Sequence, residues 1–205
     1  MVRRRVTRAE SKTRTRAELI HAANRLFLRD GFVAASLAAI AEEAGLTKGA
    51  VYSNFDSKEA LFLELLEEAD GPGRWYAPAA VDKSSGSTPR SRARAFGRTA
   101  AQVRPSRRHV ALFLEMNAFA LRSDRMRKRV AEYNRTFFAE LGERLREALD
   151  QPDADAIELG LVAQSLWVGL MMHAAYDDVA SDALFERAYE MLARTAERSA
   201  ASRRG

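Results

Sequence analysis

The chain has 205 residues, with 33 Lys or Arg against 28 Asp or Glu and no cysteine. The lack of cysteine excludes disulfides, Cys-ligated zinc, iron–sulfur clusters and thiol catalysis, and it fits a reducing compartment. No apolar run approaches the ~20 residues of a membrane span, and the basic N-terminus is not followed by the apolar segment of a secretory signal. We therefore expect a cytoplasmic protein with no membrane partner.

Positive charge is concentrated at the start of the chain. Residues 1–16 carry seven basic side chains, Arg3, Arg4, Arg5, Arg8, Lys12, Arg14 and Arg16, against the single acid Glu10. Such an arm suits contact with nucleic-acid phosphates. A solvated, disordered tail is the alternative that the charge pattern leaves open.

The N-terminal part of the chain shows apolar residues at helical spacing. A first helix is predicted over 12–30, ending at Asp30-Gly31, where glycine accepts the left-handed conformation. Ser36 and Thr47 are good N-caps for two short helices of about nine residues each. A fourth helix begins at Ser57-Lys58-Glu59 and continues to about Ala69. The short second and third helices must pack on their neighbours, since isolated helices below ~12 residues are marginal in water.

The segment from Leu37 to Phe55 is typical of a helix-turn-helix, with Gly45 at the turn between its two helices. This motif places its second helix in the major groove of DNA. An ordinary helical hairpin is the structural alternative. We predict an all-α fold: a helix-turn-helix three-helix bundle over 12–60, and a larger helical domain over 61–200.

The rest of the chain predicts five more helices. Residues 70–89 are rich in Gly, Pro and Ser and indicate a loop, and Thr88-Pro89 suits a helix start. The predicted helices cover about 89–104, 106–121, 124–149, 154–177 and 182–199. The Asp153-Ala-Asp155 sequence lacks the glycine of a calcium loop, so we interpret it as a helix cap.

The helix from Ile157 to Tyr176 has almost no charge after Glu158, so apolar side chains point in every direction. A helix that is apolar all round is buried all round. We predict that the last two helices pair with their copies in a homodimer. A central core helix of a monomer is the alternative.

Several polar residues of the helix-turn-helix are suited to contact DNA. Ser36 and Thr47 lie at helix N-termini, which favour phosphate. Gly49 permits close approach, Lys48 and Asn54 can hydrogen-bond base edges, and Lys58 is a candidate phosphate contact. Tyr52 can bond phosphate or pack on the first helix. The predicted DNA-binding residues are Ser36, Thr47, Lys48, Gly49, Ala50, Tyr52, Ser53, Asn54 and Lys58.

Residues 16–65 resemble the DNA-binding domain of the TetR family of bacterial transcriptional repressors. The shared features are Leu26-Phe27, Gly31-Phe32, Ser36, Ile40-Ala41, Ala44-Gly45, Thr47-Lys48-Gly49, Tyr52, Phe55 and Lys58-Glu59-Ala60-Leu61. Ala35 departs from a common threonine, which removes a phosphate contact. Ser53 and Asn54 replace bulkier residues, which changes the bases that are read.

No catalytic constellation is found. The histidines His21, His109 and His173 lie on separate predicted helices without metal-ligand spacing, and phosphate-binding glycine loops and nucleophile motifs are absent. We predict that the chain is not an enzyme and uses no metal or cofactor.

The resemblance implies a C-terminal cavity for a small inducer. Aromatic and Met side chains suit an adaptable apolar pocket, although they also fill ordinary cores. The candidate set is Phe113, Met116, Phe119, Tyr133, Phe137, Trp167, Met171 and His173. The predicted function is a repressor that an apolar or aromatic small molecule releases from a double-stranded DNA operator. The alternative is a helical small-molecule binding protein without DNA-binding activity.

Overall fold

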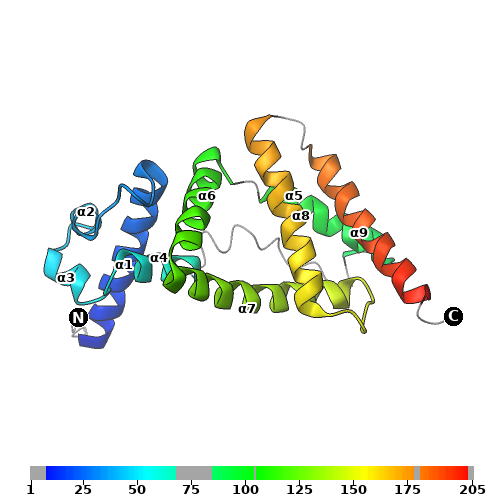
Figure 1. The fold of residues 1–205 in the computed structure, drawn as a ribbon, viewed down its shortest axis with the longest axis horizontal. Coiled ribbons are helices and arrows are strands. Elements are labelled where there is room, and N and C mark those ends of the chain that lie inside the picture. Colours follow the sequence, from blue (N-terminus) through cyan, green and yellow to red (C-terminus); the bar gives the residue numbers. More distant parts are fainter. Residues whose placement is uncertain (1–7, 68–84, 104, 178–180, 203–205) are drawn as a thin grey trace, which may run out of the picture. The chain divides into compact units, whose positions relative to one another are not determined.

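The computed structural model describes residues 8–67, 85–103, 105–177 and 181–202. All regular structure within these ranges is helical (Figure 1). The helices are α1 (Arg8–Asp30), α2 (Leu37–Glu43), α3 (Lys48–Tyr52), α4 (Lys58–Glu67), α5 (Pro89–Gln102), α6 (Arg107–Arg122), α7 (Asp124–Ala148), α8 (Ala156–Tyr176) and α9 (Asp182–Ser202). The predicted all-α class is confirmed.

Most helix boundaries lie within two residues of the prediction. Two differences concern the N-terminal region. The first helix begins at Arg8, so the basic residues from Arg8 to Arg16 form part of a helix rather than an arm. The helices α2 and α3 have seven and five residues, fewer than the nine that the sequence predicts. The predicted loop over 70–84, the end of the fourth helix and Arg3, Arg4 and Arg5 lie outside the described residues.

The described chain divides into two compact units. The first contains α1–α4 together with residues 111–126, and the second contains the described residues of 75–110 and 127–205. Residues 111–126 belong mainly to α6, which follows α5 in sequence. The sequence predicted a domain boundary near residue 60 and did not predict that residues 111–126 belong to the first unit. The boundary itself stays a prediction.

An aromatic cluster forms the core of the first unit. The rings of Phe27, Phe32 and Phe62 have centroids 5.3–6.0 Å apart, and Phe119 of α6 lies 5.1 Å from Phe32. The four side chains come from α1, the turn after it, α4 and α6. Because α2 and α3 are too short to be stable alone, this cluster provides the support on which they depend.

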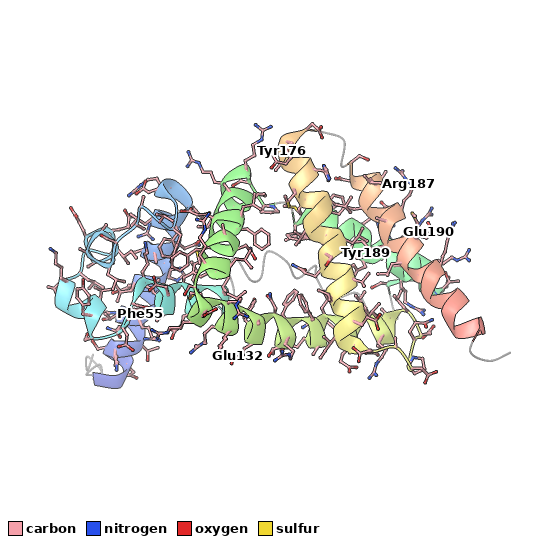
Figure 2. The ribbon with its side chains drawn as sticks, in the orientation of Figure 1. Phe55, Glu132, Tyr176, Arg187, Tyr189 and Glu190 are labelled. Carbon is pink, nitrogen blue, oxygen red and sulfur yellow. The ribbon has the colours of Figure 1, made fainter. Side chains whose placement is uncertain are left out.

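The second unit is built on close packing of α5 against α9 and of α8 against α9. Tyr189 on α9 donates its hydroxyl to Ala163 O on α8 at 3.0 Å, and its ring lies 4.8 Å from that of Phe96 on α5 (Figure 2). Burial raises the pKa of Tyr189, which keeps the phenol protonated as a donor. Trp167 on α8 donates its indole N–H to Ala100 O at 3.2 Å.

Caps define the helix starts that the sequence predicts. The hydroxyl of Thr88 accepts the N–H of Ser91 at 3.1 Å, and the hydroxyl of Ser91 accepts the N–H of Thr88 at 2.9 Å. Pro89 is the first helical residue. Asp155 accepts the N–H of Glu158 at 2.8 Å, which confirms its predicted role as a cap. Such caps occupy N–H groups that the first helical turn leaves without partners.

The helix α8 has one buried face and one partly exposed apolar face. It buries Leu159, Gly160, Ala163, Trp167 and Met171, whereas three large apolar side chains, Ile157, Leu161 and Val162, are 42–45% exposed. By length and composition it is sufficient to cross a membrane, so the expectation that no segment approaches this length was wrong. A core or interface helix of a soluble protein passes the same test.

Candidate nucleic-acid interface

Two side-chain caps define the helix-turn-helix. The hydroxyl of Ser36 accepts the N–H of Ala39 at 3.1 Å at the start of α2, and the hydroxyl of Thr47 accepts the N–H of Ala50 at 3.2 Å at the start of α3. Both residues have the extended backbone of N-caps. The predicted caps are therefore confirmed. Each hydroxyl is already bonded to its own helix, so a phosphate here would share the site with the cap.

The turn between the two helices requires glycine. Gly45 has φ +66°, a conformation that side chains other than glycine rarely adopt. Its N–H donates to Glu42 O at 2.9 Å, and the next N–H, of Leu46, donates to Ala41 O at 2.8 Å. These bonds end α2 and redirect the chain toward α3.

The five-residue α3 has one buried and one exposed face. Val51 is fully buried, whereas Lys48 and Gly49 are exposed and Tyr52 is 59% exposed. A Cβ placed on Gly49 would find only Thr47 Oγ1 within 4 Å, at 3.8 Å. The structure thus presents Lys48, Gly49 and Tyr52 to solvent, and the exposure of Tyr52 favours the predicted contact role over packing on α1.

Ser53 and Asn54 bond back to the end of α3. The Ser53 hydroxyl donates to Ala50 O at 2.9 Å, and the Asn54 side-chain amide donates to the same oxygen at 2.8 Å. The amide oxygen of Asn54 is buried. Both side chains stabilise the end of the helix here, so a base contact by Asn54 would require a different rotamer.

Lys58 has a role that the sequence did not predict. Its ammonium group donates to the carbonyls of Phe32, Val33 and Ala35, at 2.6, 3.1 and 2.7 Å. It also lies 4.5 Å from the centre of the Phe32 ring. Partial burial lowers the pKa of Lys58. The ammonium group holds the turn between α1 and α2, and this geometry offers no phosphate contact.

Arg16 is a second structural cation that sequence reasoning missed. Its guanidinium forms a bidentate pair with Glu64 of α4, donates to Asn54 O at 2.6 Å and lies 4.3 Å from the centre of the Phe55 ring. Phe55, which lies three residues after the end of α3, is labelled in Figure 2. Arg16 therefore ties α1 to α4 and to the end of α3. Its basic character suggested a phosphate contact, and only tertiary contacts show otherwise.

Glu115 is the third residue that the sequence did not single out. Its two carboxylate oxygens accept the N–H groups of Phe32 and Val33, at 2.9 and 2.7 Å. Glu115 is 82 or more residues from these partners in sequence. No local pattern predicts such a contact.

The proposed ligand residues belong to both units. Phe113, Met116 and Phe119 lie in the part of α6 that clusters with the first unit, and the other five belong to the second. Met116, Trp167 and Met171 are buried, His173 is exposed, and Tyr133 and Phe137 are half-buried with stacked rings 6.4 Å apart. Phe119 packs on Phe32, so its observed role is in the core of the first unit. The assignment of these residues to a ligand stays a prediction.

The arrangement of α1–α4 defines a helix-turn-helix domain of the DNA-binding type. Residues 19–65 match the sequence model of the family described as "Bacterial regulatory proteins, tetR family". Residues 19–65, which include α2 and α3, are therefore similar to the DNA-binding domain of this family.

Two curated relatives match part of the chain. The chain is 46% identical over 67 residues to the HTH-type transcriptional regulator TtgR of Pseudomonas putida, which covers 33% of this chain and 30% of that protein. It is 43% identical over 53 residues to AcrR of Shigella flexneri, covering 26% and 25%. The chain thus spans about a third or less of the length of these curated relatives.

Solved structures extend the likeness in fold. Salmonella enterica GusR superimposes with a TM-score of 0.69 at 18% identity, covering 94% of this chain and 98% of GusR. The reduced form of NemR from E. coli gives 0.64 at 23% identity, covering 87% and 95%. These values show that the fold extends over most of the described chain.

The ammonium group of Lys58 is expected to stabilise the fold, whereas that of Lys48 is not. Lys58→Met removes the donor to three carbonyls and should lower the free energy of unfolding by about 1–3 kcal/mol. Lys48→Met removes the same ammonium group from an exposed side chain and should change the free energy of unfolding by no more than about 0.5 kcal/mol. Chemical denaturation followed by circular dichroism measures both. Equal stability of the two variants would contradict the assigned role of Lys58.

Proposed function

We propose that this protein is a sequence-specific DNA-binding transcriptional regulator of the repressor type. The observation that carries the proposal is the solvent-exposed face of α3, where Lys48, Gly49 and Tyr52 lie together on a helix that Thr47 caps. A double-stranded operator would receive this face in its major groove. We also propose that the protein is located in the cytoplasm.

Charge supports a phosphate-binding role around this face. Lys12 and Arg14 are exposed near the start of α1, and Lys48 opens α3. Contacts of this kind position the protein on DNA without reading sequence. Ala50 and Ser36 are also proposed to contact DNA. Ala50 lies in α3 beside its exposed face, and Ser36 lies at the start of α2.

We further propose a homodimer formed through α8 and α9. The exposed apolar residues Ile157, Leu161 and Val162 of α8, with Met191 of α9 at 66% exposure, support this assignment. Such exposed apolar surface marks interaction sites in soluble proteins. A dimer would present two copies of α3 to a two-fold symmetric operator.

An apolar or aromatic effector is proposed for the second unit. Tyr133 and Phe137 are half-buried and stack on one face of α7. Aromatic side chains of this kind supply contact area for planar ligands. The ligand would lower DNA affinity only if it binds the DNA-free state more tightly than the DNA-bound state.

The first prediction from the proposed function concerns DNA recognition by α3. Gly49→Ala should preserve the fold, because the added Cβ meets only an ordinary contact. It should weaken binding to DNA enriched by the wild-type protein about tenfold or more, because the added methyl group hinders the close approach of α3 and costs about as much as one base contact. Fluorescence anisotropy at two salt concentrations measures this affinity. Arg144→Ala, which removes an exposed charge from α7, is the control and should bind almost like wild type.

Two results would contradict the DNA-binding proposal. One is a wild-type protein that enriches no sequence from a random pool. The other is an affinity that does not fall as salt rises, since phosphate contacts release counterions. Either result would favour the helical small-molecule binding protein instead.

The second prediction concerns the dimer. Light scattering should give the wild-type protein twice the 22.8 kDa mass of one chain. Leu161→Asp places a charge on the exposed apolar face of α8 and should shift the protein toward the monomer. Leu121→Asp is the matched control, because Leu121 is 76% exposed on α6. A dimer that persists in Leu161→Asp would place the interface elsewhere.

The third prediction concerns the effector. A planar aromatic compound that binds the second unit should change tryptophan fluorescence and lower DNA affinity over the same concentration range. Phe137→Ala should weaken both responses by at least about tenfold, the lower end of the cost of losing a buried aromatic contact. A compound that releases DNA equally well from wild type and Phe137→Ala would contradict the proposed site.

A further inference from the structure

The connection between α1 and α2 is held by two charged side chains from other helices. Glu115 of α6 accepts the N–H groups of Phe32 and Val33. Lys58 of α4 donates to the carbonyls of Phe32, Val33 and Ala35. All of these residues belong to the first unit. Two side chains of opposite charge therefore occupy five polar backbone groups within four consecutive residues.

The carboxylate of Glu115 approaches the backbone so closely that it determines which residue can precede Phe32. Gly31 has φ +86°, and a Cβ placed there would lie 2.8 Å from Glu115 Oε2. A side chain at position 31 would thus be strained by its backbone conformation and would also displace the carboxylate. The position of the Glu115 carboxylate therefore depends on a glycine at position 31.

This turn determines where α2 begins. Ser36, the N-cap of α2, follows Ala35 directly, and Ala35 is bonded through its carbonyl to Lys58. The Phe32 ring is fully buried in the aromatic cluster, so both its side chain and its backbone are fixed. Because α2 has only seven residues, its direction depends on this anchored start rather than on its own stability.

We propose that Glu115 is a positioning residue for DNA recognition, which it supports without touching DNA. With Lys58 it holds residues 32–35, and so fixes α2 and the α3 that follows it in the orientation that reads the operator. This inference rests on the proposed DNA-binding function. It adds a residue of α6, outside the helix-turn-helix sequence, to those that determine operator specificity.

The chemistry of the contact selects the test variant. A glutamate has two acceptor oxygens, one for each N–H group. Glu115→Gln has nearly the same shape, but its amide nitrogen is a donor and would face one of the two N–H groups. The substitution therefore removes the negative charge from both hydrogen bonds and leaves one N–H without its acceptor. Glu115→Asp keeps the charge but shortens its reach by one methylene.

The experiment compares specific binding, random-sequence binding and amide exchange. DNA enriched by the wild-type protein and a random duplex are both titrated by anisotropy with wild type, Glu115→Gln, Glu115→Asp and the exposed control Glu132→Gln. Glu115→Gln should bind the enriched DNA about tenfold more weakly, as expected for one lost hydrogen bond to a charged group. Its affinity for the random duplex should be unchanged, because the phosphate-contacting cations are intact.

Hydrogen exchange of residues 31–36 supplies the readout of the contact itself. Exchange of the Phe32 and Val33 amides should be about tenfold faster in Glu115→Gln than in wild type, with the control Glu132→Gln unchanged. A variant that is merely unstable would lose specific and random binding together, since both require the folded domain. If Glu115→Gln does not fold, Glu115→Asp provides the same comparison.

Distinct outcomes overturn distinct claims. Unchanged exchange of the two amides would show that Glu115 does not hold the turn. Faster exchange with unchanged preference for the enriched DNA would show that the turn does not position the reading helix. Either result overturns this proposal and leaves the proposed function intact. A wild-type protein that enriches no sequence overturns the proposed function, and this inference with it.

Discussion

The first unit depends on one constraint: the helices that would meet DNA are too short to be stable by themselves. The helices α2 and α3 have seven and five residues, well below the length at which a helix persists alone in water. These two helices are therefore stabilised by packing on longer neighbouring helices. The Phe27, Phe32 and Phe62 rings provide the apolar support, and the caps of Ser36 and Thr47 satisfy the helix starts.

Three charged side chains add hydrogen bonds to the stabilisation that the apolar core provides. Arg16, Lys58 and Glu115 are all chemically suited to contact a partner, yet each is bonded to the protein backbone in this structure. A turn without regular backbone pairing leaves N–H and carbonyl groups that must find partners. Partly buried charges therefore hold the turns, and the exposed face of α3 remains available to DNA.

Local sequence information predicted the parts of the fold that have local causes. Most helix bounds, the caps at Ser36, Thr47 and Asp155, and the turn at Gly45 follow from short-range chemistry and agree with the structure. The start of α1 and the lengths of α2 and α3 differ from the prediction. The roles of Lys58 and Arg16 could not be predicted in this way. A lysine or arginine near a DNA-binding helix suggests a phosphate contact, and only tertiary packing shows that its donors are occupied.

The C-terminal half gave a weaker sequence signal for the same reason. The apolar composition of α8 predicted burial, but the structure leaves one face exposed in the single chain, where a second copy would supply the missing contacts. Its apolar residues could equally fill a core, line a pocket or form an interface. Burial separates Trp167 and Met171 from the exposed Leu161 and Val162, a distinction that composition does not contain.

The most direct test of the central claim is chemical footprinting of the wild-type protein on the DNA sequence that it enriches from a random pool. The account predicts two protected major-groove segments related by two-fold symmetry and separated by about one helical turn of 10–10.5 base pairs or a multiple of it. Lys48→Ala should lose this protection while the protein remains folded. Protection confined to the minor groove, or unchanged protection by Lys48→Ala, would contradict the assignment of α3 as the reading helix.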